Sequence, residues 1–312
     1  DPVYKYIPAF RDQGVFRMGN YPQFLTERPE RPMRIKDLLM HTSGLTYGFM
    51  HSTNVDAAYR KAGLDGARTK KTLEETVETL AGIPLEFSPG EAWNYSMATD
   101  VLGYLVQVVS GKPFENFLRE EIFEPLGMSD TGFFVPAEKQ NRLPSCYERR
   151  ANKKLVLQDD PQKSPYLEMP SCPSGGGGLV STAQDYLRFC EMMRRGGELD
   201  GARLLSRKTI DLMTCNHLPD DMDLTQMARG SFSETPYEGV GFGLGFSVNL
   251  GAGRTGTAGS AGEYAWGGAA STAFWIDPAE ELVVIFMTQL MPSATYDFRA
   301  QLRAITYGSI ID

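Results

Sequence analysis

A tyrosine next to a tight turn is the residue of this chain whose side chain is best placed to take part in catalysis. Tyr95 follows the pair Pro89-Gly90, and Ser96 comes directly after it. Proline fixes φ and glycine adopts conformations that other residues avoid, so the pair predicts a turn. We expect Ser96 to cap a helix with Asp100 in its positively polarised first turn, which places a phenol at a loop-to-helix junction. Taken alone, the pattern is more typical of a core aromatic beside a turn.

Histidines and cysteines offer little to metal chemistry in this sequence. The cysteines are widely spaced, no Cys-x-x-Cys occurs, and no histidine pair lies nearby, so we expect neither a metal site nor a cofactor. We interpret the cysteines as free thiols in a reducing, cytoplasmic compartment, although their number also permits two disulfides. The histidines are His41, His51 and His217, and the cysteines are Cys146, Cys172, Cys190 and Cys215.

A run of glycines, Gly175 to Gly178, leads into Leu179-Val180-Ser181-Thr182. A phosphate-binding loop would need Gly-Lys-Ser/Thr after such a run, and that sequence is absent. The run instead indicates a close approach of the backbone to a pocket or to another strand.

Composition and charge narrow the classes of partner. The chain has 312 residues, 42% hydrophobic and 22% charged, which suits one large domain or two intimately packed ones. A net charge of −8 disfavours nucleic acid and anionic membrane surfaces. No apolar run approaches the roughly 18 to 20 residues that span a bilayer. The longest, Leu282 to Met287, has the length of a buried strand.

Helical patterns dominate the first two thirds of the chain. Residues 1–35, rich in proline and aromatics, are interpreted as an extended surface connection, and the charged run 148–154 as a solvated hairpin or flap. The apolar residues of 99–110 occupy most of the helix circumference, which predicts that this helix is buried. Helices are predicted at about residues 35–40, 54–62, 72–81, 99–110, 114–122, 183–195 and 206–213.

Strand patterns dominate the last third. Apolar segments lie between Gly, Asp and Pro turns, including Asp277-Pro278, and predict consecutive antiparallel strands joined by hairpins. A helix over about 295–310 closes the chain. Strands grouped after helices are typical of an α+β fold with an antiparallel sheet. The predicted strands are residues 241–248, 255–260, 270–276 and 282–287.

The sequence contains four stretches that fit one family pattern in this order: Leu38 to Leu45, Phe87 to Ser96, Gly175 to Thr182, and Trp266-Gly267-Gly268. Together they resemble the serine β-lactamase-like superfamily of class C β-lactamases, D-alanyl-D-alanine peptidases and family VIII carboxylesterases. The resemblance covers essentially the whole chain. It implies a β-lactamase/penicillin-binding-protein-like α+β fold: an antiparallel sheet flanked by helices (about 236–312), plus a mainly helical region (about 36–235), in one catalytic unit over 1–312.

The resemblance implies acyl transfer through a serine activated by a lysine, with Tyr95 as proton shuttle. A phenol with an ordinary pKa of about 10 can act as a base near neutrality only if a cation favours the phenolate. Trp266-Gly267-Gly268 matches the edge strand that carries Lys-Thr-Gly in true β-lactamases. Its glycines would let an acyl group lie against the strand. The N–H of Ala269 would then be the second oxyanion donor.

Two departures from the family pattern shape the prediction. The sequence contains no Ser-x-x-Lys. We therefore expect the nucleophile, the first helix and the first strands to lie upstream of Asp1, and the 312 residues to be inactive alone. Trp266 replaces the cationic lysine and offers an apolar plane with one N–H donor, which favours uncharged esters. A packing aromatic on a strand is the alternative. His41 is expected to make a structural hydrogen bond beneath the site, because no Gly-x-Ser-x-Gly elbow occurs.

The sequence thus predicts a serine carboxylesterase whose partner is a small-molecule ester; it does not predict an oligomeric state. Tyr47, Tyr237 and Phe242 are candidates for lining the acyl pocket, on position and aromaticity. A β-lactamase or D-alanyl-D-alanine peptidase is an alternative that needs a cation near Trp266, which Arg254 could supply. A non-catalytic binding protein that has lost its nucleophile is a third.

Overall fold

The first 120 residues and two later segments form one folded unit. The computed structural model describes residues 1–64, 69–230 and 236–311. The N-terminal unit consists of Asp1–Glu120, Met169–Leu179 and Met227–Gly230. The sheet unit consists of Glu121–Glu168, Val180–Gln226 and Ser231–Asp312. That the two make one catalytic unit stays a prediction.

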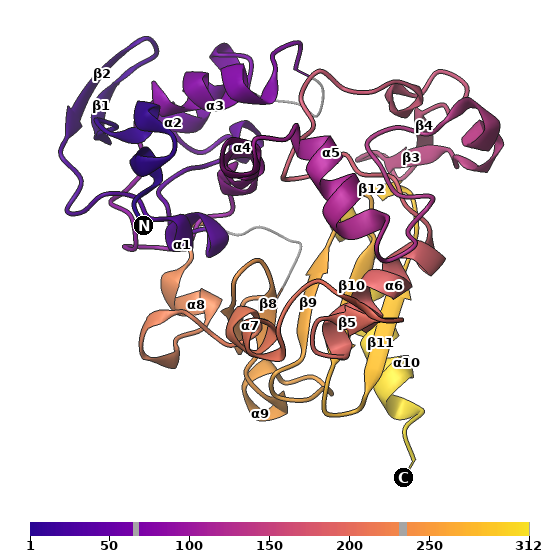
Figure 1. The fold of residues 1–312 in the computed structure, drawn as a ribbon. Coiled ribbons are helices and arrows are strands. Elements are labelled where there is room, and N and C mark those ends of the chain that lie inside the picture. Colours follow the sequence, from indigo (N-terminus) through magenta and orange to yellow (C-terminus); the bar gives the residue numbers. More distant parts are fainter. Residues whose placement is uncertain (65–68, 231–235, 312) are drawn as a thin grey trace. The chain divides into compact units, whose positions relative to one another are not determined.

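Helices form most of the N-terminal unit, close to where the sequence predicts them (Figure 1). Thr53 and Thr72 cap the second and third helices, each accepting a backbone N–H three residues ahead. The long helix α4 packs against α1, α3 and α5 and ends at Gly111, which has a left-handed φ of 70°. The helices are α1 (Ile35–Leu39), α2 (Asn54–Lys61), α3 (Leu73–Ala81), α4 (Ala98–Ser110) and α5 (Phe114–Leu118).

The start of α4 differs from the prediction. Met97 is its N-cap and no side chain caps the helix, because the Ser96 hydroxyl bonds to His41 instead. Asp100 does lie in the first turn, as predicted. The prediction of a buried helix holds for its first half only, since Val109 near the C-terminal end is 64% exposed.

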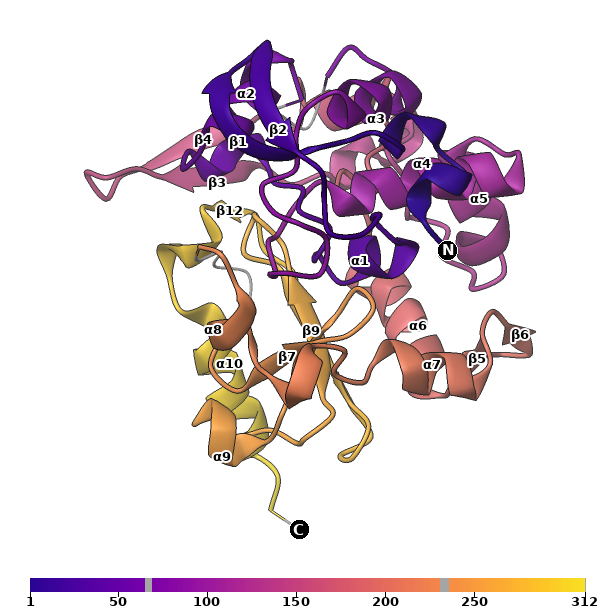
Figure 2. The ribbon, with the colours of Figure 1, turned by 90° about the vertical axis from the view of Figure 1, so that its left-hand side faces the viewer.

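The first 35 residues contain a hairpin that the sequence analysis missed (Figure 2). Strand β1 (Val15–Asn20) pairs antiparallel with β2 (Gln23–Glu27), where an extended connection was predicted. Only Val15 of these strands is buried, so there is no buried face to impose an alternating pattern on the sequence.

The sheet unit is built on a sheet of consecutive antiparallel strands, as predicted, but with five strands (Figure 1). The single strand predicted at 241–248 is two short strands, residues 240–242 and 247–249, which pair as a hairpin. The Asp277 carboxylate accepts a hydrogen bond from the Ala279 N–H and closes the predicted turn between β10 and β11. The predicted strand at 255–260 is wrong. A short helix, α9 (Ala252–Thr255), ends there at Gly256 in a left-handed conformation. The strands are β7 (Val240–Phe242), β8 (Ser247–Asn249), β9 (Tyr264–Gly267), β10 (Ala273–Asp277) and β11 (Leu282–Phe286).

Helices cover both faces of this sheet. Tyr186 of α6 (Ala183–Arg194) contacts Phe274 of β10 at 5.1 Å between ring centroids. Arg303 of α10 (Phe298–Gly308) lies 4.8 Å from the ring of Trp275, the next residue of β10. Successive side chains of a strand point to opposite faces, so α6 and α10 lie on opposite sides of the sheet. Thr182 caps α6 by accepting the Asp185 N–H.

Smaller elements complete the sheet unit. The charged run 148–154 lies in the predicted hairpin, the long ribbon of β3 and β4 in Figure 2. The four cysteines are free thiols, as predicted. Among the described residues, no helix combines the length and the apolar character that a membrane span requires. The remaining elements are β3 (Cys146–Arg149), β4 (Leu155–Asp159), β5 (Glu198–Leu199), β6 (Ala202–Arg203), α7 (Arg207–Met213), α8 (Leu224–Met227) and β12 (Leu290–Met291).

Candidate active site

Tyr95 lies at a loop-to-helix junction, in the last residues before α4, and its side chain is half-buried. Backbone hydrogen bonds fix this loop on both sides. The Trp93 N–H donates to the Met227 carbonyl, and the Asn94 N–H donates to the His41 carbonyl at 2.8 Å. The loop therefore holds the phenol on a rigid backbone.

Aromatic rings surround the Tyr95 side chain. Ring centroids lie 4.9 Å away for His41, 5.1 Å for Tyr47 and 6.5 Å for Trp93. Tilted and stacked contacts at these separations are favourable and limit rotation of the ring. The orientation of Tyr95 is thus set by packing within the N-terminal unit.

His41 is a buried, neutral base beneath this tyrosine. It is 3% exposed, and its Nδ1 lies 3.2 Å from the Ser96 hydroxyl. Burial lowers the pKa of His41 to about 3, so the imidazole is uncharged near neutral pH. The structural hydrogen bond predicted for His41 is confirmed, with Ser96 as its partner.

Burial of His41 has a consequence for the pH dependence of stability. The pKa is about 3 in the fold and 6.5 for an ordinary histidine. Between these values the unfolded chain binds the additional proton, so stability falls as the pH is lowered through this window, by at most about 1.4 kcal/mol per pH unit. We expect His41→Asn to flatten the pH dependence of the urea-unfolding free energy between pH 6.5 and about 5. Asparagine tolerates the left-handed φ of 56° at this position. Equal slopes in the two proteins would show that the native histidine is not held neutral.

The glycine run approaches the first turn of α4. A Cβ on Gly175 would lie 2.0 Å from the Thr99 carbonyl oxygen, which only a glycine avoids. The Ser174 hydroxyl donates to Asp100 Oδ1, and the N–H groups of Gly175 and Gly176 also donate to this carboxylate. The predicted close backbone approach is confirmed, but the partner is a helix rather than a strand.

Tyr47 lies next to Tyr95, with ring centroids 5.1 Å apart. Its ring stacks on Phe49 at 4.7 Å, and its hydroxyl hydrogen-bonds to Tyr95. Burial, followed by the negative charge of Asp100, raises the pKa of Tyr47 well above 10. The sequence predicts Asp100 in the first turn of a helix but does not predict its association with Tyr47 and Tyr95. The signal was the glycine run, which marked a close approach without naming what it approaches.

Trp266 lies on β9, which is not the edge strand that the sequence predicts. Strand β9 is the middle strand of the sheet, between β8 and β10. However, β8 pairs with β9 only as far as Ala265, opposite Ser247, so Trp266 and Gly267 extend beyond the end of β8. Although β9 is a central strand, its end therefore projects past β8 and forms a local edge of the sheet on that side.

Phe242 and Trp266 are brought together in the sheet unit. Their rings meet edge to face with centroids 5.6 Å apart, and Phe242 is 1% exposed. Phe242 therefore packs behind the indole and supports it. Tyr237 is half-buried just ahead of β7, where its carbonyl accepts the Val240 N–H.

The first glycine after Trp266 makes room for an arginine. A Cβ on Gly267 would lie 2.3 Å from Nη2 of Arg299, and this Nη2 donates to the carbonyls of Gly268 and Thr272. The Gly268 N–H donates to the Thr272 carbonyl and closes the turn between β9 and β10, where Ala269 is exposed. Packing of Arg299 thus explains glycine at 267 without a substrate.

Arg254, the cation named for the β-lactamase alternative, is paired with a carboxylate. Its Nη1 forms an ion pair with Asp221 at 2.9 Å, and its Nη2 donates to the Asp221 carbonyl. Among the described residues, no group of three or more His, Cys, Asp or Glu side chains could hold a metal ion.

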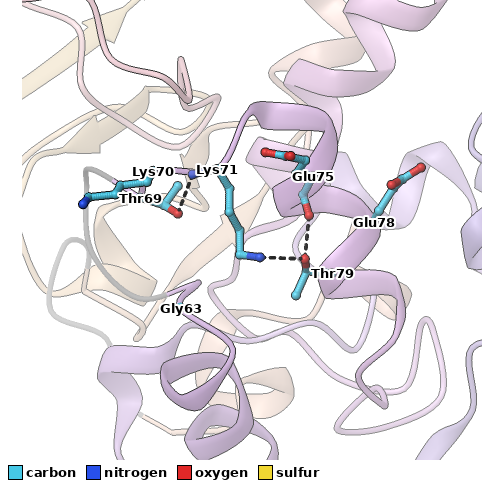
Figure 3. A pocket seen from close by; sticks show the side chains of 7 residues that line it. All are labelled: Gly63, Thr69, Lys70, Lys71, Glu75, Glu78 and Thr79. Atoms are coloured by element: carbon cyan, nitrogen blue, oxygen red, sulfur yellow. Dashed lines mark hydrogen bonds between the residues drawn. The ribbon is translucent and has the colours of Figure 1, made fainter.

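Two hollows occur in the described residues, and Tyr95 lines neither of them. A cavity of about 530 Å³ lies on the α10 side of the sheet, bordered by Trp266, Trp275 and Arg303. A pocket of about 650 Å³ in the N-terminal unit lies between Thr69–Lys71 and α3 (Figure 3). There the Lys71 ammonium and the Glu75 carbonyl both contact the Thr79 hydroxyl (Figure 3). None of the residues predicted for the site lines this second pocket.

Most of the chain is similar to known proteins of one family. A family model described as Beta-lactamase matches residues 1–307. Protein Rv1367c of Mycobacterium tuberculosis is 34% identical over 304 residues, covering 96% of this chain and 73% of that protein. Esterase EstB of Burkholderia gladioli is 30% identical, covering 92% of this chain and 69% of that protein.

A solved structure shares the fold. EstCE1, described as a hydrolase with promiscuous acyltransferase activity, superposes with a TM-score of 0.78 at 27% identity. The match covers 99% of this chain and 77% of that one. The β-lactamase/penicillin-binding-protein-like fold predicted from the sequence is therefore confirmed.

Proposed function

The chain belongs to the beta-lactamase family, and we propose that it acts as a serine hydrolase of carboxylic esters through an acyl-enzyme intermediate. The observation that carries the proposal is the half-buried phenol of Tyr95, held by a fixed loop and packed between rings. A rigidly placed acid–base group is what a proton shuttle requires. The serine and lysine of the mechanism, as predicted from the sequence, lie outside residues 1–312.

Tyr95 handles the proton in both halves of the proposed reaction. As a phenolate it takes the proton of the serine hydroxyl while the serine oxygen attacks the ester carbonyl. As a phenol it returns that proton to the departing alcohol. The N–H of Ala269 stabilises the oxyanion. Water then attacks the acyl-enzyme and gives its proton to Tyr95, which passes it to the serine oxygen as the acid is released.

Trp266 supports an uncharged ester as the substrate. A lysine at this place would bind a substrate carboxylate, whereas an indole offers an apolar plane and one N–H. The Arg254 guanidinium is paired with Asp221, so it does not favour the β-lactamase alternative. EstB, an esterase by its description, is among the relatives.

The proposal predicts a preference that can be measured with two chromogenic substrates. We expect the product of the complete gene to hydrolyse p-nitrophenyl butyrate with a kcat/KM at least about 100-fold above that for nitrocefin. Trp266→Lys is expected to narrow this ratio by on the order of tenfold, because an ammonium adds one charge-assisted contact to the carboxylate of nitrocefin. Faster hydrolysis of nitrocefin would favour the β-lactamase alternative. No turnover of either substrate would favour the binding-protein alternative.

Acyl transfer to an alcohol is a second candidate, supported by the description of EstCE1 as a hydrolase with acyltransferase activity. An alcohol could replace water at the acyl-enzyme without any other change in the site. Adding benzyl alcohol to the ester assay and quantifying benzyl ester against free acid would separate the two activities.

A further inference from the structure

A buried carboxylate lies beside the proposed proton shuttle and has no part in the mechanism above. Asp100 is 5% exposed in the first turn of α4. It accepts hydrogen bonds from the Ser174 hydroxyl and from the N–H groups of Gly175 and Gly176. A buried carboxylate costs free energy unless such bonds satisfy it, and here burial raises its pKa in spite of them.

The Asp100 carboxylate and the Tyr47 hydroxyl meet at the backbone of Gly176. A Cβ placed on Gly176 would lie 2.6 Å from the Tyr47 hydroxyl and 3.1 Å from Asp100 Oδ2. Both groups therefore border the same small space, which exists only because residue 176 has no side chain. The negative charge of Asp100 disfavours a second negative charge on Tyr47.

The direction of the hydrogen bond between Tyr47 and Tyr95 follows from this arrangement. Burial and Asp100 raise the pKa of Tyr47, so its hydroxyl keeps its proton over a wide pH range. Once Tyr95 is ionised, its oxygen can only accept, so the Tyr47 hydroxyl, which still carries its proton, is then the donor. A donated hydrogen bond stabilises a phenolate more than a phenol.

We propose that Asp100 is a positioning residue which, through Tyr47, sets how tightly Tyr95 holds its proton. Asp100 keeps Tyr47 protonated, and Tyr47 in turn favours the phenolate of Tyr95. For its catalytic meaning the inference rests on the proposed function. Two other titratable groups of the N-terminal unit lie close to Tyr47, Tyr95 and Asp100. His41 contacts the ring of Tyr95, and the Cys172 thiol lies near Asp100. His41 is neutral near neutral pH, as shown above.

Tyrosine ionisation can be followed directly, without a substrate. We would label the product of the complete gene with ¹³Cζ-tyrosine and titrate it by NMR over the pH range in which far-UV circular dichroism shows an intact fold. Tyr→Phe variants assign the signals. Tyr95 is expected to ionise at a lower pH than Tyr47, and Tyr47→Phe is expected to raise the midpoint of Tyr95 by about one to two pH units. Asp100→Asn is expected to lower the midpoint of Tyr47 by about one unit.

Matched variants separate this role from a loss of packing. Tyr104→Phe removes a hydroxyl that bonds to Glu74 in the same unit, and Asp56→Asn changes another buried carboxylate in a first helix turn. Neither should move the Tyr95 midpoint. The inference is overturned if Tyr47→Phe leaves the midpoint of Tyr95 in place, or if Tyr47 ionises before Tyr95 in the wild type. A folded Asp100→Asn that leaves the midpoint of Tyr47 in place would likewise overturn the inference, and if that variant does not fold, the wild-type order still tests whether Tyr47 acts on Tyr95.

The titration and the ester assay can fail independently. If the midpoints move as expected but no ester is hydrolysed, the positioning role stands and the proposed function fails. If esters are hydrolysed while the midpoints do not move, the proposed function stands and the positioning role fails.

Discussion

Tyr95→Phe is expected to lower kcat/KM for a p-nitrophenyl ester by about 10²- to 10⁴-fold in the product of the complete gene. The substitution removes a single oxygen. It keeps the ring that packs against His41, Tyr47 and Trp93, so the loop before α4 should remain in place. A loss of this size would therefore report the lost proton transfer rather than a disturbed fold.

Tyr104→Phe is the matched control for this experiment. It removes one hydroxyl from the same unit, whose bond to Glu74 on α3 has no place in the proposed mechanism. We expect its activity to stay within about threefold of the wild type. If Tyr95→Phe retained activity comparable to Tyr104→Phe, with both melting at the wild-type temperature, Tyr95 would not be the proton shuttle.

Gly175→Ala is expected to be the most destabilising single-methyl change in the glycine run. The new Cβ would lie 2.0 Å from the Thr99 carbonyl oxygen and 2.8 Å from its carbon, and both are backbone atoms that cannot rotate away. The loop or the first turn of α4 must shift, which typically costs about 1 to 3 kcal/mol and occasionally more. The same shift would pull the Gly175 and Gly176 N–H groups from Asp100.

Gly177→Ala provides the comparison two residues away. A Cβ on Gly177 meets nothing within 4 Å, so its free energy of unfolding should stay within about 0.5 kcal/mol of the wild type. Urea denaturation of both variants measures the difference. Equal stabilities would mean that the glycine run does not approach α4 as closely as described.

Much of the fold could be predicted because its signals are local. Gly111 ends α4, Thr182 caps α6, and Asp277-Pro278 turns the chain between two strands, each through chemistry contained in a few neighbouring residues. The hairpin β1–β2 was missed because its mostly exposed faces leave no alternation in the sequence. The strand predicted at 255–260 failed because glycines and threonines suit a short helix and a turn as well as a strand.

A candidate site residue could be named from the sequence only where one residue type carries the proposed chemistry. Tyr95 could be named from its motif, but the partners that orient and tune it come from distant segments. Ser96 has the chemistry of a helix cap, and only the fold shows that its hydroxyl is used by His41. Likewise, Asp100 and Ser174 are 74 residues apart, and no local pattern connects them.

Trp266 shows the same limit in the sheet. The sequence predicts an edge strand from the motif, whereas the structure makes β9 the middle strand and exposes its end by shortening β8. Strand order depends on pairing between segments, which the residues of one strand do not determine. The motif predicted the local environment of Trp266 better than its place in the sheet.

The acyl-enzyme is the central claim, and trapping it is the most direct test. The product of the complete gene would be treated with a p-nitrophenyl alkylphosphonate, which transfers a phosphonyl group to an activated serine, and analysed by intact-protein and peptide mass spectrometry. We predict one adduct, on the serine of a Ser-x-x-Lys peptide outside residues 1–312, formed far more slowly in Tyr95→Phe. No adduct, or an adduct on a serine within residues 1–312, would contradict the proposed mechanism.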